Sequence, residues 1–346
     1  MKAYEIRDFG KTGKLTLVDR PIPTPKAGEA LIKVRATGLN ARDLSIMAGT
    51  QFGRTIAPTL IPLSDNAGDV VAVGAGVANV APGDRVTMTH YWRWLDGAWD
   101  ESMREEDFAM TQDGFLVEQA VVPAAALVKL PDSVSYEEAS TLQSAGLTAW
   151  HAVVEAGNAK PGQTVVTLGT GGVSVFAMQW AKMVGARVIV TSSSDDKLAR
   201  MKELGADDGV NYLTNPNWSK DVMALTDGQG AHLVVNNVGL AELDQCLEAS
   251  ASGGCTAHIG ANPVSANRTA TTPEPPKRLG LLIMRNLTIK GIIVGSRTMF
   301  VTLLDQMAKH DIKPVIDRVY PFDEINDAIA YMAGAGKIGK VVIRVP

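Results

Sequence analysis

The chain has 346 residues, 46% of them hydrophobic, and a formal net charge of −4. This length and apolar content suit one large or two medium domains with well-filled cores. The mild negative charge and the lack of a basic cluster argue against a nucleic-acid or anionic-membrane surface. The sequence has only two cysteines, Cys246 and Cys255, so it offers no disulfide framework and no CxxC metal spacing.

Two further features concern the location of the protein. No apolar run approaches the roughly 20 residues that a membrane-spanning helix needs. The first stretch, MKAYEIRDFG, lacks the apolar core of a signal peptide. We therefore expect a cytoplasmic protein that binds neither membrane nor nucleic acid.

The N-terminal part predicts strands. In EALIKVRATG, Ile32 and Val34 alternate with Lys33 and Arg35, which is the period of a half-buried strand. DVVAVGAGV indicates a second strand, and PGDRV is a Pro-Gly turn into a third. The next stretch, HYWRWLDGAWDESMREED, holds three of the six tryptophans without a clear period. We predict a surface lobe whose aromatic side chains bury one another, with a border to the substrate as the alternative.

From about Pro131 the pattern changes. SYEEASTLQSAGLTAWHAVVEAG predicts a helix whose first residues, Ser135 and Glu138, have the spacing of a capping box. Short apolar strands then alternate with helices, and the strands are TVVTLG, RVIVTS, HLVVNNVG, CTAHIG and LTIKGIIVGSR. This alternation predicts βαβ units and a parallel sheet with both faces covered.

Two segments near the C-terminus complete the pattern. The stretch NPVSANRTATTPEPP is longer than most connections and predicts a lid or a partner-facing loop. The last segment, from KPVIDRVYP onward, indicates a strand, a helix, a glycine turn and a strand, which we expect to rejoin the first domain.

One turn carries a chemical signal. The strand TVVTL runs directly into Gly169, Thr170, Gly171, Gly172, Val173 and Ser174, and then into a helix. This is the context of a dinucleotide fingerprint, in which Gly169 allows the tight turn, Gly171 leaves room for a pyrophosphate and the helix N-terminus supplies N–H donors. Ser174 replaces the third glycine and is still small. We predict a dinucleotide site, with an ordinary turn in a nucleotide-free domain as the alternative.

The end of the next strand predicts which dinucleotide binds. Enzymes that use NAD usually carry Asp or Glu there to hold the ribose 2′-hydroxyl. This chain has Ser192, Ser193 and Ser194, with Lys197 one helical turn further on. No carboxylate repels a 2′-phosphate, so we predict NADP. A capping role for Ser194, with Asp195 complementing the helix dipole, is compatible with this prediction.

Several stretches together resemble the medium-chain dehydrogenase/reductase superfamily, and most closely its zinc-free branch of quinone and enone reductases. They are GLNARD, AGDVVAVGAGV, PGDRV, GFLVEQAVVP, AGLTAW, KPGQTVVTLGTGGVSVFAMQWAK, LGADDGVNY and GKIGKVVIRV. The resemblance implies an α/β protein with a GroES-like, mostly β catalytic domain (1–127 and 298–346) and a Rossmann domain with a doubly wound parallel sheet (128–297). It also implies an active site between the domains and a homodimer formed through the Rossmann sheet edge.

The resemblance also implies site residues. Ser193, Lys197 and Tyr212 would surround the adenosine 2′-phosphate, and Thr148 would lie beside the nicotinamide. Further coenzyme contacts are expected where strands end: Asn237, Val238, Gly239, Gly260, Ala261, Gly295, Ser296 and Arg297. Asn40 stands where zinc-dependent relatives carry a metal-binding cysteine, and we expect it to orient the substrate or the nicotinamide ribose. Its alternative role is to hold a turn.

The other zinc positions are also substituted. Zinc-dependent relatives carry Gly-His-Glu early in the chain and a cysteine before the Rossmann domain, whereas this chain has Leu63-Ser64-Asp65 and Gln143-Ser144. A catalytic zinc needs three ligands from Cys, His or carboxylate, and only Asp65 qualifies. The five histidines, His90, His151, His232, His258 and His310, have no metal-ligand spacing. We predict no metal.

The missing metal favours one kind of reaction. Hydride transfer to a simple carbonyl builds alkoxide charge that zinc normally stabilises. In a quinone or an α,β-unsaturated carbonyl the charge spreads over a conjugated enolate, so hydrogen-bond donors suffice. We therefore predict NADPH-dependent reduction of quinones or activated C=C bonds. The alternatives are a metal-independent alcohol or aldehyde dehydrogenase and a non-catalytic NADPH-binding protein.

The catalytic residues predicted by this hypothesis are Asn40, Asp43 and Ser64. The proton donor stays open among Asp43, Ser64, Asp65, His90, Tyr91 and solvent, because position alone suggests these residues. Asp43 and Asp65 have a second interpretation, in which they only form hydrogen bonds within loops.

Overall fold

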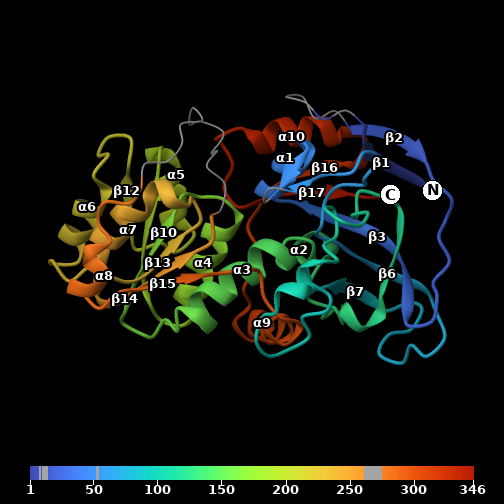
Figure 1. The fold of residues 1–346 in the computed structure, drawn as a ribbon, viewed down its shortest axis with the longest axis horizontal. Coiled ribbons are helices and arrows are strands. Elements are labelled where there is room, and N and C mark those ends of the chain that lie inside the picture. Colours follow the sequence, from blue (N-terminus) through green and yellow to red (C-terminus); the bar gives the residue numbers. More distant parts are fainter. Residues whose placement is uncertain (8, 10–14, 52–53, 261–274) are drawn as a thin grey trace. The chain divides into compact units, whose positions relative to one another are not determined.

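The computed structural model describes residues 1–7, 9, 15–51, 54–260 and 275–346. The chain forms two compact units, Met1–Leu147 with Val294–Pro346, and Thr148–Ile293. Figure 1 colours the chain from its N-terminus to its C-terminus. Most of the stretch predicted as a lid or partner-facing loop, and Ala261 before it, lie outside the described residues.

The first unit is built around a mostly antiparallel sheet. Its strands follow the order β16-β17-β3-β6-β7-β9, and β8 also pairs with β3. Their bounds are β3 Glu29–Leu39, β6 Ala67–Val73, β7 Arg85–Met88, β8 Gln119–Pro123, β9 Leu127–Lys129, β16 Ile316–Pro321 and β17 Lys340–Arg344. Val342 of β17 lies opposite Gly38 of β3, so the last strand of the chain completes a sheet begun near the N-terminus.

Shorter elements surround this sheet. Two small antiparallel pairs join β1 (Lys2–Ile6) to β2 (Leu15–Asp19) and β4 (Thr50–Gln51) to β5 (Arg54–Thr55). The helices of this unit include α1 (Ala41–Met47), α2 (Tyr136–Ala139), α9 (Arg297–His310) and α10 (Ile325–Ala333).

Burial in β3 follows the alternation expected from sequence. Ile32 and Val34 are fully buried, and Lys33 and Arg35 are partly exposed. Both apolar side chains join one core with residues of α1 and α10, including Ile46 and Ile325. The half-buried strand predicted here is confirmed, because each face of β3 meets a different environment.

The tryptophan-rich segment after β7 packs on itself. Tyr91 and Trp94 are almost fully buried, and each meets the ring of Trp99 edge-on, at centroid distances of 4.9 and 5.1 Å. The Trp94 indole N–H donates to the Gly97 carbonyl at 2.9 Å. Local burial of these aromatic rings is thereby confirmed.

The helix predicted after Pro131 begins at its capping box. The Glu138 amide donates to Ser135 Oγ at 3.1 Å, and the Ser135 amide donates to Glu138 Oε2 at 2.8 Å. The helical stretch then alternates between α2, α3 (Leu147–Trp150) and two π-helical stretches, Leu142–Gly146 and His151–Ala156. Such π stretches often occur near functional sites.

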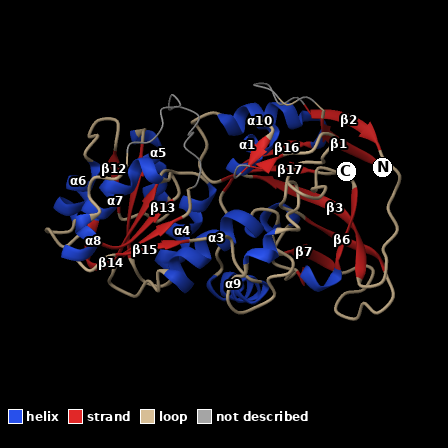
Figure 2. Ribbon diagram, in the orientation of Figure 1, coloured by secondary structure: helices blue, strands red, loops and turns tan. Residues whose placement is uncertain are grey.

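The second unit is a six-stranded parallel sheet in the order β12-β11-β10-β13-β14-β15. Its strands are β10 Thr164–Leu168, β11 Arg187–Ser192, β12 Asp208–Asn211, β13 Ala231–Asn236, β14 Ser250–His258 and β15 Thr288–Gly291. The connecting helices, drawn in Figure 2, are α4 Gly172–Met183, α5 Asp195–Glu203, α6 Trp218–Leu225, α7 Leu243–Ala249 and α8 Gly280–Met284. The order reverses between β10 and β13, as in the Rossmann fold.

Helices cover this sheet. All five residues of β10 are buried. Trp218 of α6 and Cys246 of α7 share a core cluster with Val166 and Val234 of the strands. Right-handed crossovers place α4 and α5 on the opposite face. The predicted doubly wound sheet is confirmed, because the six strands run parallel and helices pack against the sheet.

The last strand of this sheet is shorter than the sequence suggested. It ends at Gly291, so Gly295, Ser296 and Arg297 do not lie at a strand end. They belong instead to the first unit, where Ser296 caps α9 by accepting from the Met299 amide at 3.2 Å. The apolar run IIVG favoured a longer strand, whereas the serine before a long helical stretch was the signal for a helix cap.

Within the described residues, no helix has the length and apolar character needed to cross a membrane.

Candidate functional site

The glycine turn, residues 169–174, joins β10 to α4. Gly169 has a φ of +81°, a conformation that favours glycine strongly. Gly171 caps α4 and provides no side chain to the first turn of the helix. A Cβ built on Gly171 would meet no atom within 4 Å, so the space beside this backbone is open. Such a turn fits the diphosphate of a dinucleotide, which helix N–H groups would bind.

Ser174 links this turn to a neighbouring strand end. The side chain is fully buried, and its hydroxyl donates to the Leu168 carbonyl at 2.7 Å and accepts from Asn237 Nδ2 at 2.8 Å. The hydroxyl therefore bonds to β10 and to the residue after β13. These two strands flank the point at which the strand order reverses, which is where doubly wound sheets bind ligands.

The ends of β13 and β14 lie together. Asn236 Oδ1 accepts from the amides of Val238 and Gly239 at 3.1 and 2.9 Å, which forms the turn after β13. A Cβ on Gly260 would come within 2.5 Å of the Val238 carbonyl carbon, so the two backbones are in contact. Asn236 was not predicted as a site residue, although an Asn-Asn pair at a strand end indicates such a turn.

The residues predicted for the 2′-phosphate follow two neighbouring strands, with Ser193 and Lys197 after β11 and Tyr212 after β12. Lys197 Nζ lies 3.5 Å from Ser193 Oγ, and the Tyr212 amide donates to the Ser192 carbonyl at 3.0 Å. Ser194 caps α5 by accepting from the Lys197 amide at 3.4 Å, so the cap and the proposed pocket coexist. Burial lowers the pKa of the Lys197 ammonium, as expected for a cation partly removed from water.

Thr148, the predicted nicotinamide neighbour, is almost fully buried and lies in α3. Gly295 lies beside Leu147 in the first unit, where an added Cβ would approach the Leu147 side chain to 2.8 Å. Arg297 donates to the Leu127 carbonyl at 3.2 Å, so its guanidinium has a structural contact.

A buried polar cluster lies in the first unit and is centred on Lys340. Lys340 Nζ donates to the Leu39 carbonyl at 2.7 Å, to Asn40 Oδ1 at 2.7 Å and to Asp65 Oδ2 at 3.2 Å. Lys340 is 3% exposed and Asp65 is fully buried. These contacts use all three N–H donors of the ammonium.

The cluster continues from the other oxygen of Asp65. Ser144 Oγ donates to Asp65 Oδ1 at 2.6 Å and lies 3.2 Å from His90 Nδ1. Arg42 contacts His90 Nε2 and donates to Asp107 Oδ1 at 2.9 Å. His90 Nε2 also lies 3.2 Å from Asp107 Oδ1. We refer to these residues together as the Lys340 cluster: Lys340, Asn40, Asp65, Ser144, His90, Arg42 and Asp107.

The structure thus brings together positions that are scattered along the sequence. Asn40, Asp65 and Ser144 come from the three segments that correspond to zinc-ligand segments in zinc-dependent relatives. Ser64, beside Asp65, is 1% exposed, and its hydroxyl has no hydrogen-bond partner among the described residues. Lys340, Arg42 and Asp107 were not predicted from the sequence. Of the three, only Lys340 carried a signal, as a charged residue directly before the apolar run VVI.

Asp43 lies next to this cluster, at the start of α1. Its Oδ2 accepts from the Asn40 amide at 2.7 Å, and its Oδ1 has no hydrogen-bond partner within the described chain. Burial raises the pKa of the Asp43 carboxyl to about 7, although the nearby Arg42 charge and the Asn40 amide oppose the shift. A carboxyl in this state can hold or release a proton near neutral pH.

The donor set does not fit a catalytic zinc ion. At the three corresponding segments the chain offers an amide, hydroxyls and one carboxylate, whereas zinc in proteins prefers thiolate, imidazole and carboxylate. An ammonium group already contacts both Asn40 Oδ1 and Asp65, and it would repel a second cation. In the part of the chain that the structure describes, no three His, Cys, Asp or Glu residues group as metal ligands.

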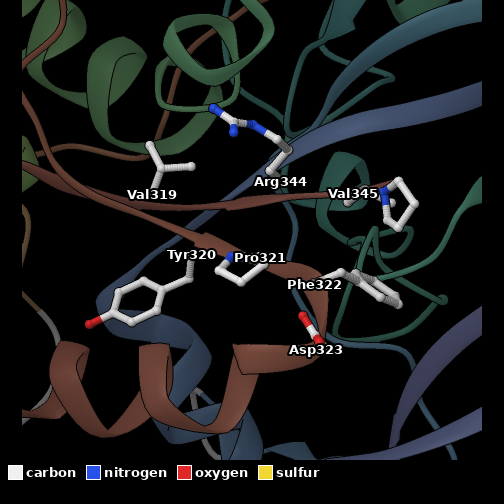
Figure 3. A pocket seen from close by; sticks show the side chains of 8 residues that line it. Val319, Tyr320, Pro321, Phe322, Asp323, Arg344 and Val345 are labelled. Atoms are coloured by element: carbon white, nitrogen blue, oxygen red, sulfur yellow. The ribbon is translucent and has the colours of Figure 1, made fainter.

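A separate cavity of about 660 Å³ lies in the first unit near the end of the chain. It is lined by Val319, Tyr320, Pro321, Phe322, Asp323, Arg344, Val345 and Pro346. Figure 3 shows the side chains of Val319 and Tyr320 pointing to opposite sides of their strand. No predicted site residue lines this cavity, and we assign no part of the reaction to it.

Comparison with known proteins identifies the family. Residues 26–132 match the alcohol dehydrogenase GroES-like domain, and residues 172–309 match a zinc-binding dehydrogenase domain. A zinc-type alcohol dehydrogenase-like protein of Schizosaccharomyces pombe is 38% identical over 92% of this chain and 91% of its own. The chain belongs to the zinc-type alcohol dehydrogenase-like family of medium-chain dehydrogenases/reductases.

Solved structures of this family agree in fold. A structure described as an NAD-dependent alcohol dehydrogenase covers 100% of both chains, with a TM-score of 0.88 and 32% identity. A mycobacterial protein solved in complex with NADPH covers 99% of this chain and 100% of its own, with a TM-score of 0.81 and 29% identity. Family members thus bind either nicotinamide coenzyme.

These matches settle the broader predictions. The chain is an oxidoreductase of the medium-chain superfamily, with a GroES-like domain and a Rossmann-type sheet, as predicted. The narrower assignment to quinone and enone reductases stays a prediction, because the Schizosaccharomyces pombe relative is described as alcohol dehydrogenase-like and the NAD-dependent structure as an alcohol dehydrogenase.

Proposed function

We propose that this zinc-type alcohol dehydrogenase-like protein interconverts an alcohol and an aldehyde or ketone without a catalytic zinc ion. The names of its relatives support the alcohol–carbonyl reaction. The proposal that no zinc takes part rests on the buried Lys340 ammonium. It donates hydrogen bonds to Asn40 and Asp65, which lie in segments where zinc-dependent relatives bind the metal.

Different residues of the chain have different roles in this proposed reaction. When bound, a nicotinamide coenzyme would supply or accept the hydride. Asn40 donates a hydrogen bond to the substrate oxygen, which bears alkoxide charge during the transfer, and such donors are most effective in a site without water. Asp43, with a pKa of about 7, gives that oxygen its proton in reduction and takes it back in oxidation. Ser64 supplies a further hydroxyl as a hydrogen-bonding group in the site.

We further propose a preference for NADPH. The support is the group formed by Ser193 and Lys197 after β11 and Tyr212 after β12, in which the Ser193 hydroxyl and the Lys197 ammonium lie 3.5 Å apart. A 2′-phosphate would accept hydrogen bonds from both groups, whereas NADH offers only a ribose hydroxyl there.

The test is a panel of coenzymes and substrates. NADPH or NADH consumption is followed with an aldehyde, a cyclic enone and 1,4-benzoquinone, and NADP⁺ reduction with the matching alcohol, each with and without a chelator. We expect alcohol oxidation and aldehyde reduction that the chelator leaves unchanged. Activity that a chelator abolishes and zinc restores would contradict the proposal.

A second candidate is NADPH-dependent reduction of quinones or α,β-unsaturated carbonyls. The same lack of a zinc donor set favours it, because an enolate spreads its charge and needs no cation. Enone or quinone reduction without any alcohol oxidation in the panel would establish this candidate instead. Tight NADPH binding without turnover of any substrate would indicate a binding protein.

We also propose a homodimer formed through the edge of the parallel sheet. β15 is the last strand on one side, and three of its four residues are exposed. In the preceding α8, the side chains of Ile283 and Met284 are 89% and 81% exposed. A second copy of the chain would cover this edge and these apolar side chains.

A further inference from the structure

The Asn40 side chain has a fixed orientation in the Lys340 cluster. An ammonium group has no acceptor, so the amide atom that faces Lys340 Nζ at 2.7 Å must be the oxygen. The amide nitrogen therefore points away from Lys340. An amide in solution has no such preference, because its two ends can exchange by a rotation of the side chain.

The Asn40 nitrogen retains donor capacity. Its single hydrogen bond among the described residues goes to the Gly38 carbonyl at 3.4 Å, which is long for an N–H···O bond. An amide nitrogen carries two hydrogens, so at least one of them remains for another acceptor. Asn40 is 8% exposed, and an acceptor reaching this nitrogen would be largely out of water.

Lys340 itself is held firmly. It begins β17, which pairs with β3 up to Leu39, the residue directly before Asn40. Asp65 balances the ammonium charge on one oxygen, and Ser144 binds its other oxygen at 2.6 Å. All three Lys340 donors are occupied, so this ammonium has none left for a substrate and acts through Asn40.

We propose that Lys340 is a positioning residue, which holds Asn40 Oδ1 so that Asn40 Nδ2 donates to the substrate oxygen that gains negative charge during hydride transfer. This inference rests on the proposed function and adds to it the residue that determines which end of Asn40 meets the substrate. A buried cation is thus used to orient a neutral donor, where zinc-dependent relatives use a metal.

The first test is Asn40→Asp. A carboxylate still accepts from Lys340, so the contact within the cluster survives, but the N–H donor is lost. We expect kcat to fall about 10²-fold, as for the loss of one oxyanion donor, with a KM within a few-fold of wild type and an unchanged melting temperature. An Asn40→Asp enzyme as active as wild type overturns the inference.

The second test asks whether Lys340 acts through Asn40. We expect Lys340→Met to lower kcat about tenfold or more in the wild-type protein and less than about twofold when Asn40 is already alanine, because the residue it orients is then gone. Lys313→Met, which removes an exposed lysine of the same unit, serves as the matched control and should leave kcat unchanged. Equal losses in both backgrounds contradict the inference.

Lys340→Met leaves the buried Asp65 without its cation and can fail to fold. The same cycle is then measured in Asp65→Asn protein, where no charge is stranded. Substrate turnover by the wild-type protein distinguishes a failure of the proposed function from a failure of the inference about Lys340. If wild-type protein turns over no member of the substrate panel, the proposed function and this inference both fall. If wild type is active and Asn40→Asp is equally active, only the inference falls.

Discussion

Asp43 shows how burial changes a single side chain. The pKa of its carboxyl is raised to about 7, chiefly by burial. The folded protein therefore binds a proton here more tightly than the unfolded chain does. The stabilising contribution of this proton is fully present below the unfolded pKa, near 4, and is lost as pH rises through about 7.

We expect Asp43→Asn to flatten the pH dependence of stability. Three pKa units correspond to about 4 kcal/mol, so the wild-type free energy of unfolding should fall by up to that amount between pH 4 and 8 relative to the variant. Urea unfolding at several pH values measures the difference. Asp96→Asn, at an exposed aspartate, is the control. Parallel pH profiles for wild type and Asp43→Asn would show that Asp43 does not titrate in this range.

Ser193 is the residue at which coenzyme choice can be tested. We expect Ser193→Asp to lower the ratio of kcat/KM for NADPH to that for NADH by at least about tenfold, because a carboxylate repels the 2′-phosphate and accepts from a ribose hydroxyl. Ala199→Asp places the same charge on an exposed position of α5 and should leave the ratio unchanged. An unchanged ratio in Ser193→Asp would reject the placement of the phosphate.

At the scale of elements, the two glycines of the β10–α4 turn have different roles. Gly169 needs its positive φ of +81°, which is a requirement of the fold. Gly171 has ordinary helix-capping angles and open space around it, so nothing in the protein itself requires a glycine there. We propose that the coenzyme supplies the reason for Gly171, because a bound diphosphate would have to approach its backbone closely.

This difference is measurable. We expect Gly169→Ala to reduce the free energy of unfolding by about 1 kcal/mol or more, because alanine is strained at positive φ. Gly171→Val should unfold like wild type and bind NADPH at least about tenfold more weakly, as measured by fluorescence titration. Wild-type affinity in Gly171→Val would mean that the diphosphate does not bind at this turn.

At the scale of the whole molecule, the exposed sheet edge is the feature that a single chain leaves incomplete. Ile283 and Met284 are large apolar side chains with exposures of 89% and 81%. Exposed apolar groups beside an open strand edge favour association. The proposed dimer would bury both.

We expect wild-type protein to elute as a dimer and the double variant Ile283→Asp, Met284→Asp as a monomer with an unchanged circular dichroism spectrum. Light scattering coupled to size exclusion measures both masses. Leu213→Asp, at an exposed leucine of the same unit, controls for added charge and should remain dimeric. A wild-type monomer, or a dimer that the double variant leaves intact, would contradict the proposed interface.

The sequence by itself determined the elements and the turn that points to the coenzyme. Alternation in β3, the Ser135–Glu138 cap and the glycine turn all depend on residues within a few positions of one another, and local sterics and hydrogen bonding express them directly. The same local reasoning failed after Gly291, where an apolar run suggested that the strand continued. The substitution of the zinc-ligand positions could also be recognised from the sequence, because each position lies in a segment that resembles the corresponding segment of zinc-dependent relatives.

Only the tertiary structure decided the chemistry of the Lys340 cluster. Lys340 lies 300 positions from Asn40 and 275 from Asp65 along the chain. The register of β17 on β3 brings Lys340 Nζ to the end of β3, and burial then makes each polar partner necessary. No local pattern encodes such a pairing, because it arises from strand register and burial between segments that are distant in sequence.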